Sequence, residues 1–244
     1  MSERRRRQAG AVQARAVVFD LFNTLTAPVD DEAYRASVRS MGMAAGVDPA
    51  GFSRAWFDQW RERSDGTFAT TAAVVRGVCE AIGARVDVAA VGRAVEAQVE
   101  FSRRALRPRE DAVATLGRLR ERGLRTALVS NCAPDVPELW PTTPYAELID
   151  EPLFSCVERL VKPDANLYLR ACTRLGVQPA SCVYVGDGDD RELTGAAQAG
   201  MRAMLVRTPA WRAASFQSER ASWPGEAIES LSHLPGLIAS GEGA

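Results

Sequence analysis

The 244-residue sequence predicts an α/β fold: a Rossmann-like, doubly wound parallel sheet core with an all-helical cap subdomain inserted after the first strand. Two observations lead to this prediction. Short continuous apolar runs alternate with helical patterns along much of the chain, and one long stretch after the first run contains no strand pattern. Strands that are buried on both faces and separated by helices are typical of parallel sheets. Ligands of such sheets bind beyond the carboxyl ends of the strands.

Four apolar runs are the predicted core strands, and each is too short to be a helix. They are residues 16–19, 126–129, 183–185 and 203–206. Between the runs, residues 111–121 and 167–175 repeat apolar side chains at helical spacing, and Gly176 marks the end of the second helix. The alternation of strand and helix therefore predicts a doubly wound sheet.

The stretch between the first two strands breaks this alternation. It is rich in Ala, Arg, Val and Glu, and it carries Trp56, Phe57 and Trp60 at helical spacing. We interpret it as an all-helical cap whose aromatic side chains serve mainly in internal packing, with Pro108 marking the return to the core. The predicted domains are a core of residues 14–27 and 108–244 and a cap of residues 28–107.

Residues 1–13 contain the run Arg4 to Arg7 without apolar periodicity, which predicts a disordered basic tail. In the whole chain, 30 Lys and Arg residues nearly balance 31 Asp and Glu residues. The balance argues against nucleic acid as a partner and favours a small-molecule substrate. No apolar run reaches the length of a membrane span, so we expect no membrane association and a cytoplasmic location.

Few residue types are available for nucleophilic chemistry. The five cysteines stand singly without CxxC spacing, which argues against zinc sites and a disulfide scaffold. His233 is the only histidine and lies near the end of the chain, so mechanisms that need a histidine base are disfavoured. Lys162 is the only lysine, in a Val-Lys-Pro-Asp segment, and is therefore a strong candidate for a functional cation.

Four polar clusters occur in order along the chain, each beside a predicted strand or loop. They are Phe19-Asp20-Leu21-Phe22-Asn23-Thr24-Leu25, Val129-Ser130-Asn131, Val161-Lys162-Pro163-Asp164, and Val185-Gly186-Asp187-Gly188-Asp189-Asp190 with Glu192. Together they resemble the four motifs of haloacid-dehalogenase-like hydrolases. Each motif is weak alone, but the ordered set covers essentially the whole predicted core.

The resemblance implies that Asp20 is a nucleophile whose carboxylate forms a covalent intermediate that water then resolves. It also implies Mg²⁺, held by the Asp20 carboxylate, the Phe22 backbone carbonyl and the Asp187 carboxylate. Asp190 and Glu192 are expected to support this ion indirectly or through water. A buried carboxylate without a partner is costly, which favours a site role for Asp20 and Asp187.

The same resemblance implies roles for four further residues. Thr24 and Ser130 would hydrogen-bond the oxygens of the transferred group, and Lys162 would neutralise charge that builds in the transition state. Asn131 would orient the substrate. These roles predict a magnesium-dependent phosphohydrolase that acts on a small phosphorylated metabolite through an aspartyl-phosphate intermediate.

Phe22 departs from the pattern of the phosphatases in this superfamily, which carry a second aspartate at that place. That aspartate protonates the leaving group, and loss of a general acid typically costs about two to four orders of magnitude in rate. We therefore expect acyl phosphates and esters of acidic phenols to be the best substrates. Asp190, Glu192 and a cap residue all stay open as the group that activates water.

One other hydrolytic function competes with this prediction, and a third is excluded. An aromatic residue at the place of Phe22 is a feature of the 2-haloacid dehalogenases, which work without metal and use an arginine early in the cap. The alignment puts Phe57 at that arginine's place, and Asp187 favours a metal. A phosphonate-cleaving reaction would need a lysine in the cap, which has none.

The alternative outside catalysis is a protein that binds a ligand or partner without turning it over. Retention of Asp20, Thr24, Lys162 and Asp187 together argues against a decayed site. The sequence predicts neither the substrate nor the oligomeric state. Near the carboxyl terminus, Trp211, Phe216 and Trp223 are expected to cover the core.

Overall fold

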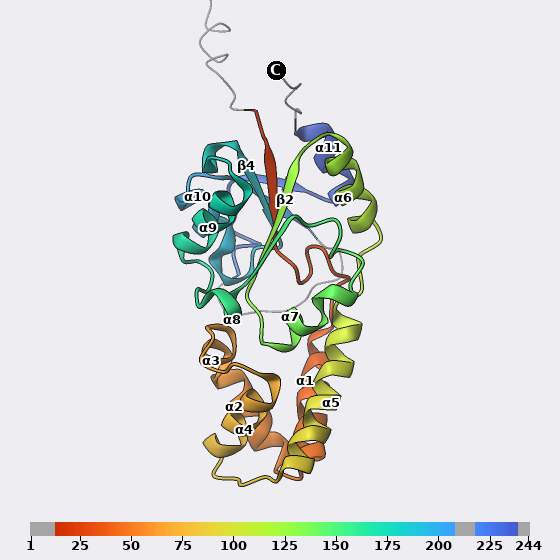
Figure 1. Ribbon diagram of the computed structural model, residues 1–244, viewed down its shortest axis with the longest axis vertical. Helices are drawn as coiled ribbons and strands as arrows, with labels where there is room; N and C mark the ends of the chain where they lie inside the picture. The colour runs from red at the N-terminus through yellow and green to blue at the C-terminus, as the bar shows by residue number, and fades with distance from the viewer. Residues whose placement is uncertain (1–12, 208–217, 239–244) are drawn as a thin grey trace, which may run out of the picture.

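The computed structural model describes residues 13–207 and 218–238, in which a six-stranded parallel sheet forms the core (Figure 1). The strand order is β3-β2-β1-β4-β5-β6, and every neighbouring pair runs parallel. The strands are β1 (Ala16–Phe19), β2 (Arg125–Ser130), β3 (Glu151–Phe154), β4 (Cys182–Gly186), β5 (Arg202–Val206) and β6 (Glu226–Ile228). The predicted doubly wound parallel sheet is confirmed.

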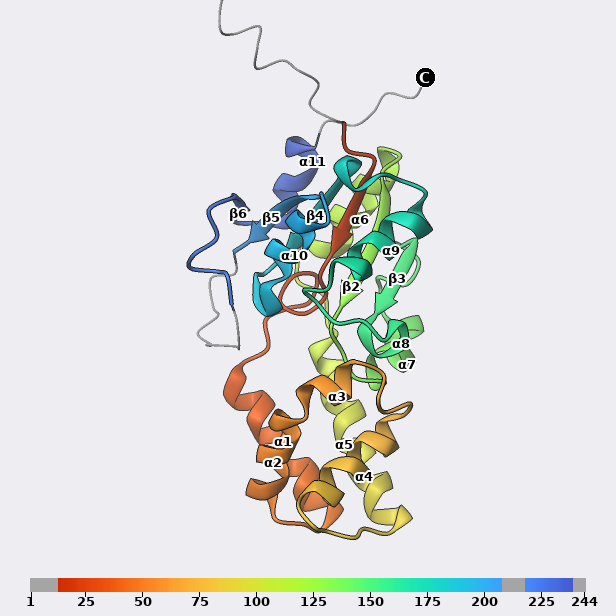
Figure 2. The ribbon, with the colours of Figure 1, turned by 90° about the vertical axis from the view of Figure 1, so that its left-hand side faces the viewer.

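Helices cover both faces of this sheet, and β1 lies near its centre (Figures 1 and 2). The side chains of Val17 and Phe19 pack on the face covered by α6 and α11, and those of Ala16 and Val18 pack toward α9 and α10. All four β1 residues are fully buried, which explains their continuous apolar run. The covering helices are α6 (Ala112–Glu121), α9 (Ala165–Leu175), α10 (Glu192–Gln198) and α11 (Leu234–Leu237).

The two core helices expected from apolar spacing are present. α6 buries Leu116 and Leu119 against the sheet, and α9 buries Leu167 and Leu175 on the opposite face. Gly176 ends α9 with φ of 66°, a left-handed conformation that glycine adopts without steric cost. The spacing of apolar residues thus predicted both the helices and the side chains that they bury.

Five helices between β1 and α6 form the cap, which lies beyond the carboxyl ends of the strands (Figures 1 and 2). They share a separate hydrophobic cluster that includes Met41, Phe52, Trp56 and Val78. An isolated bridge between Thr26 and Pro108 joins the departing and returning chain. The cap helices are α1 (Asp31–Ala45), α2 (Pro49–Asp58), α3 (Trp60–Ser64), α4 (Thr71–Ala81) and α5 (Val88–Ala105).

The insertion of a helical cap after the first strand is therefore confirmed. We propose that the cap extends over residues 28–107. The bridge between Thr26 and Pro108 lies next to both of these limits and supports them. Two short helices, α7 (Asp135–Leu139) and α8 (Ser155–Glu158), lie where the core meets the cap (Figure 1). α7 contacts α5, and α8 contacts α3.

The apolar patterns did not predict the two edge strands, β3 and β6. β3 contains Pro152, which lacks a backbone N–H and is tolerated in a strand mainly at a sheet edge. β6 has three residues, and only Ile228 is buried. Edge strands bury less apolar surface than central ones, so they leave a weaker pattern in the sequence.

The predictions for the two chain ends are only partly within the described residues. Trp223 packs against the cluster beneath α9 and α10, as expected for a residue that covers the core. Trp211, Phe216 and the run Arg4 to Arg7 lie outside the described residues. Within residues 13–207 and 218–238, no helix is long and apolar enough to cross a membrane.

Leu116→Ala should lower the free energy of unfolding by about 2–5 kcal/mol, because the fully buried side chain would leave a cavity between α6 and the sheet. Val113→Ala on the same helix is the control, since Val113 is 36% exposed and its truncation should cost about 0.5 kcal/mol. Urea denaturation measures both changes. Equal losses in the two variants would contradict the assigned burial.

Candidate active site

The carboxyl ends of three central strands bring the predicted polar residues to one edge of the sheet. β1 pairs with β2 and β4 so that Phe19 lies opposite Leu128 and Val185. Asp20 follows β1, and its backbone N–H donates to the carbonyl of Val185 across 2.9 Å. Because the strands are parallel, the residues that end β2 and follow β4 lie beside Asp20.

Lys162 makes the most extensive ionic contacts of this edge. Its Nζ lies 2.6 Å from Asp20 Oδ1 and 2.6 Å from Glu192 Oε2, and the side chain is 4% exposed. Burial alone would lower the pKa of Lys162, but the Asp20 and Glu192 carboxylates hold it well above its usual value. The only lysine of the chain therefore bridges two acidic residues, and both of them favour its charged form.

Glu192 is fixed by donors on three sides. Its Oε2 accepts the Tyr184 hydroxyl at 2.7 Å as well as the lysine, and its Oε1 accepts the Gly188 backbone N–H at 2.9 Å. Burial and the charge of Asp20 raise the pKa of Glu192 to about 8, against the opposing effect of Lys162. Gly186 is required beside it, because a Cβ there would stand 2.1 Å from Glu192 Oε1.

Asp187 lies in the same buried cluster. Oxygens of Asp20, Asp187 and Glu192 all lie within 4.8 Å of one another, which makes them candidate metal ligands. Burial, with the nearby charges of Asp189, Glu192 and Asp20, raises the pKa of Asp187 well above its usual value. A cluster of buried, mutually repelling carboxylates suits a small divalent cation.

Arg220 already pairs with Asp187 from a distant part of the chain. Its Nη2 contacts Asp187 Oδ2, and its Nε donates to the Asp187 backbone carbonyl across 2.9 Å. With Lys162, it supplies two positive charges against three clustered carboxylates. Asp189 and Asp190 flank the cluster, so its acidic groups outnumber these two basic ones, and burial, helped by their mutual repulsion, raises the pKa values of Asp187 and Asp190.

The remaining predicted residues surround Asp20 in different ways. Thr24 Oγ1 and Ser130 Oγ are buried and have no hydrogen-bond partner in the described part of the chain. Asn131 is engaged: its Nδ2 donates to Asp190 Oδ2 at 2.8 Å, and its Oδ1 accepts the Lys162 backbone N–H at 2.9 Å. The structure thus leaves two free hydroxyls for a ligand, and it uses Asn131 to join the second, third and fourth motifs.

A cavity of about 340 Å³ lies between the core edge and the cap. Phe22 is half-buried in its wall, opposite the cap residues Phe57 and Trp60. The expectation that the cap aromatics serve in internal packing fits Trp56, which is buried in the cap cluster, and Phe57, which packs against that cluster while also lining the cavity. Trp60 lines the cavity instead: α2 ends at Asp58 and Trp60 begins α3, so the helical spacing from Trp56 does not continue to it.

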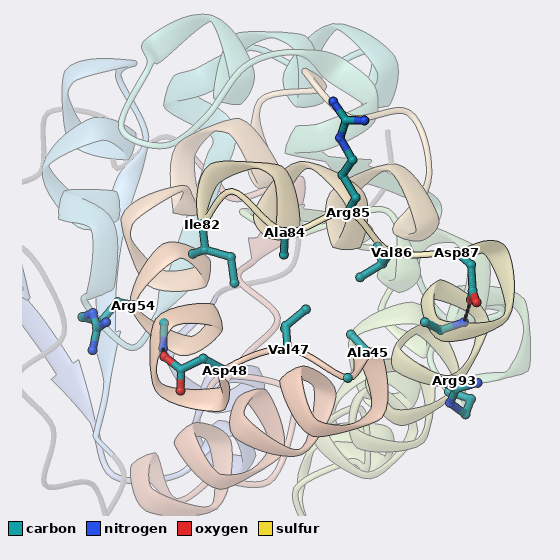
Figure 3. A pocket seen from close by; sticks show the side chains of 13 residues that line it. Ala45, Val47, Asp48, Arg54, Ile82, Ala84, Arg85, Val86, Asp87 and Arg93 are labelled. Atoms are coloured by element: carbon teal, nitrogen blue, oxygen red, sulfur yellow. Dashed lines mark hydrogen bonds between the residues drawn. The ribbon is translucent and has the colours of Figure 1, made fainter.

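A second cavity, of about 700 Å³, opens within the cap (Figure 3). Its two carboxylates, Asp48 and Asp87, accept backbone N–H groups at the amino ends of α2 and α5. Arg54, Arg85 and Arg93 also line this cavity. No residue of the four motifs lines this second cavity, whereas residues of three motifs line the cavity at the core edge. The cavity at the core edge is therefore the candidate active site.

Comparison with known proteins agrees with this geometry. The family model described as haloacid dehalogenase-like hydrolase matches residues 14–200. The chain belongs to this family. The match spans all four motifs, and the predicted resemblance is confirmed.

Members of the haloacid dehalogenase-like family with different activities resemble this chain. Glyceraldehyde 3-phosphate phosphatase of Methanopyrus kandleri is 29% identical over 79% of this chain and 84% of its own length. The structure of 2-haloacid dehalogenase from Pseudomonas syringae has 23% identity, covers 92% of this chain and 98% of its own, and gives a TM-score of 0.68. That of a phosphatase from Thermococcus onnurineus has 19% identity, 93% and 98% coverage, and a TM-score of 0.65. The likeness establishes a hydrolase fold and leaves the substrate class open.

Sequence reasoning missed three residues of the site. Tyr184 was treated only as part of a core strand, although a hydroxyl within a fully buried strand signals a polar partner. Asp135 follows the second motif and lines the cavity, so its position offered a signal. Arg220 offered none, because 33 residues separate it from Asp187 and other arginines are common in the chain.

Arg220→Gln should strengthen Mg²⁺ binding by about tenfold, because a charge-assisted bond of about 1.5 kcal/mol no longer competes for Asp187. Titration calorimetry with Mg²⁺ measures the change. Arg202→Gln is the matched control, since Arg202 pairs with Glu226 at the surface of the same sheet. Weaker binding in Arg220→Gln would show instead that the arginine orients Asp187 for the ion.

Proposed function

We propose that this protein is a magnesium-dependent phosphohydrolase that transfers the phosphoryl group of a small molecule first to Asp20 and then to water. One observation carries the proposal: three carboxylates whose oxygens lie within 4.8 Å of one another are buried at the end of the central strand. In their ionised form, these carboxylates would repel one another and an anionic substrate. A divalent cation would remove that repulsion.

The residues fit Mg²⁺ by their chemistry. The Asp20 and Asp187 carboxylates, with the Phe22 backbone carbonyl, would hold the ion through oxygen, the ligand atom that it prefers. The ion would supply charge neutralisation for the phosphoryl oxygens. Glu192 is the poorer ligand, because Lys162, Tyr184 and Gly188 already hold its two oxygens.

In the first step, a carboxylate oxygen of Asp20 forms a bond to phosphorus while the bond to the leaving group breaks and that group departs with the electron pair. Lys162, at 2.6 Å from Asp20, offsets negative charge on the phosphoryl oxygens. The unpartnered hydroxyls of Thr24 and Ser130 donate to those oxygens. Because the lysine is held by Glu192 as well, it stays in place as Asp20 loses its charge.

In the second step, water attacks the phosphorus of the aspartyl phosphate, which releases inorganic phosphate and restores the Asp20 carboxylate. Asp190 is the favoured acceptor of the water proton. It lines the cavity, and burial raises its pKa above the ordinary value for aspartate, against the lowering effects of Lys162 and Asn131. A higher pKa makes a carboxylate a stronger base. Glu192 is disfavoured because its oxygens are occupied.

Dehalogenation of a small haloacid is the second candidate. Phe22 and the neighbouring cap aromatics make part of the cavity wall apolar, and Arg220 provides positive charge at Asp187 without a metal. In that reaction Asp20 would attack carbon and halide would leave, so no general acid would be needed. Sensitivity to a chelator separates the two candidates.

Asp20→Asn should abolish phosphate release from acetyl phosphate and p-nitrophenyl phosphate, because an amide oxygen is a far weaker nucleophile. EDTA should stop the wild-type reaction, and added Mg²⁺ should restore it. Asp150→Asn, at the opposite edge of the sheet, should keep its activity. The proposal would be contradicted if the protein released chloride from 2-chloropropionate in the presence of EDTA. It would also be contradicted if none of the three compounds were hydrolysed.

Phe22→Asp should accelerate hydrolysis of alkyl phosphates by about 10² to 10⁴, because the new carboxyl group can protonate a poor leaving group. Acetyl phosphate hydrolysis should change much less, since its leaving group departs as a stable anion. Phe22→Asn controls for removal of the aromatic ring. Comparing kcat/KM for the two substrate types measures the effect, and an equal gain for both would argue against a missing general acid.

A further inference from the structure

Three polar side chains of the cavity have no role in the reaction described above. Gln98 and Ser102 come from the cap helix α5, and Asp135 is the first residue of α7 in the core. They are 5%, 4% and 1% exposed, and all three line the same cavity as Phe22 and Asp190. Burial of a carboxylate in such a place is costly unless partners compensate for it.

The side-chain hydrogen-bond donors of Gln98 and Ser102 are all engaged within this group of three residues. Ser102 Oγ donates to Asp135 Oδ2 at 2.5 Å. Gln98 Nε2 donates to the same oxygen and to Ser102 Oγ, each at 3.2 Å. The amide and the hydroxyl therefore orient the carboxylate and have no further hydrogen to offer.

Two acceptor atoms are left without donors. Asp135 Oδ1 and Gln98 Oε1 are both buried and have no hydrogen-bond partner within residues 13–207 and 218–238. A pair of unpartnered acceptors lining a cavity selects a ligand group that carries several hydrogens on one atom. A primary ammonium group offers three, and its positive charge would add to that of Arg63, which lines the same cavity and acts on Asp135 without a hydrogen bond to it in the described residues.

The aromatic side chains of the cavity suit the same group. Tyr34 and Phe101 stack with ring centroids 5.3 Å apart, and Phe57 meets Tyr34 edge-on at 5.4 Å. All three line the cavity. Arg35 already lies over the face of Phe57, with its Cζ 4.9 Å from the ring centroid, so the rings serve the ammonium group by excluding the water that would weaken an ionic contact.

We propose that Asp135 and Gln98 bind a primary ammonium group on the leaving-group side of the substrate, so that the protein acts on amine-bearing phosphorylated molecules. The proposal rests on the phosphohydrolase function proposed above, because it places the phosphoryl end at Asp20, whose charge acts on Asp190 in the cavity wall. Recognition uses a cap helix and a core helix together. Binding of the ammonium group therefore favours the arrangement in which α5 contacts α7.

Binding can be measured apart from turnover in the Asp20→Asn protein with Mg²⁺. Aminoethyl, aminopropyl and aminobutyl phosphate are each compared by calorimetry with the hydroxyalkyl phosphate of the same length. At least one amine should bind more tightly than its alcohol, by roughly tenfold, the scale of one charge-assisted contact. No preference at any length, or preference for the alcohols, would overturn the proposal.

Asp135→Asn in the same background should erase the preference, because the shape stays while the charge is lost. Gln98→Met keeps the Asp135 carboxylate and should reduce the preference for the amine by less. This variant gives an independent test if Asp135→Asn folds poorly. Glu138→Gln on α7 is the matched control and should keep the preference. A purely structural role for Asp135 would lower the melting temperature and leave the preference unchanged, which would also overturn the proposal.

The wild-type protein separates this proposal from the one on which it rests. Phosphate release from acetyl phosphate tests the phosphohydrolase function without any ammonium group. If that reaction proceeds and no amine is preferred, only the ammonium site is wrong. If neither acetyl phosphate nor an amine-bearing phosphate is hydrolysed, the phosphohydrolase function itself is wrong.

Discussion

The bridge from Lys162 to Asp20 and Glu192 is the interaction on which the site depends. It ties the end of β1 to the third-motif loop and to the start of α10, three segments that are far apart in sequence. Removing either partner of a buried ion pair leaves an uncompensated charge, so each of the three segments is stable in this position only when the other two are present. Gly186 leaves room for the Glu192 carboxylate because it has no side chain, and the Tyr184 hydroxyl donates a further hydrogen bond to that carboxylate.

The cap completes the chemistry that the core begins. In the proposed reaction the core edge would supply the nucleophile and the fixed Lys162 cation, whereas the cap supplies aromatic walls and a hydroxyl, Ser102, that donates to Asp135. Phe22 lies between the two parts. An aromatic side chain there adds apolar surface to the cavity and offers no proton, so the proposed reaction would favour leaving groups that need none.

The sequence predicted the central strands because burial on both faces forces continuous apolar runs, and it predicted the site because parallel strands end at one edge. It missed β3 and β6, which bury too little at the sheet edges to leave such runs. Arg220 and Tyr184 escaped prediction for another reason: their partners are set by tertiary packing. The same limit applies to Trp60, because the spacing of aromatic residues did not show that a new helix begins there and turns this side chain to the cavity.

The most direct test of phosphoryl transfer to Asp20 is a single turnover of acetyl phosphate in water labelled with heavy oxygen. The enzyme is in excess over the substrate, and the position of the label in the products is then determined. Attack of water on phosphorus places the heavy oxygen in inorganic phosphate, and acid quenching traps a phosphoryl group on the Asp20 peptide. Mass spectrometry of both products should find these signals. Heavy oxygen in the Asp20 carboxylate would contradict the account, because it would mean that water attacks the carboxylate carbon.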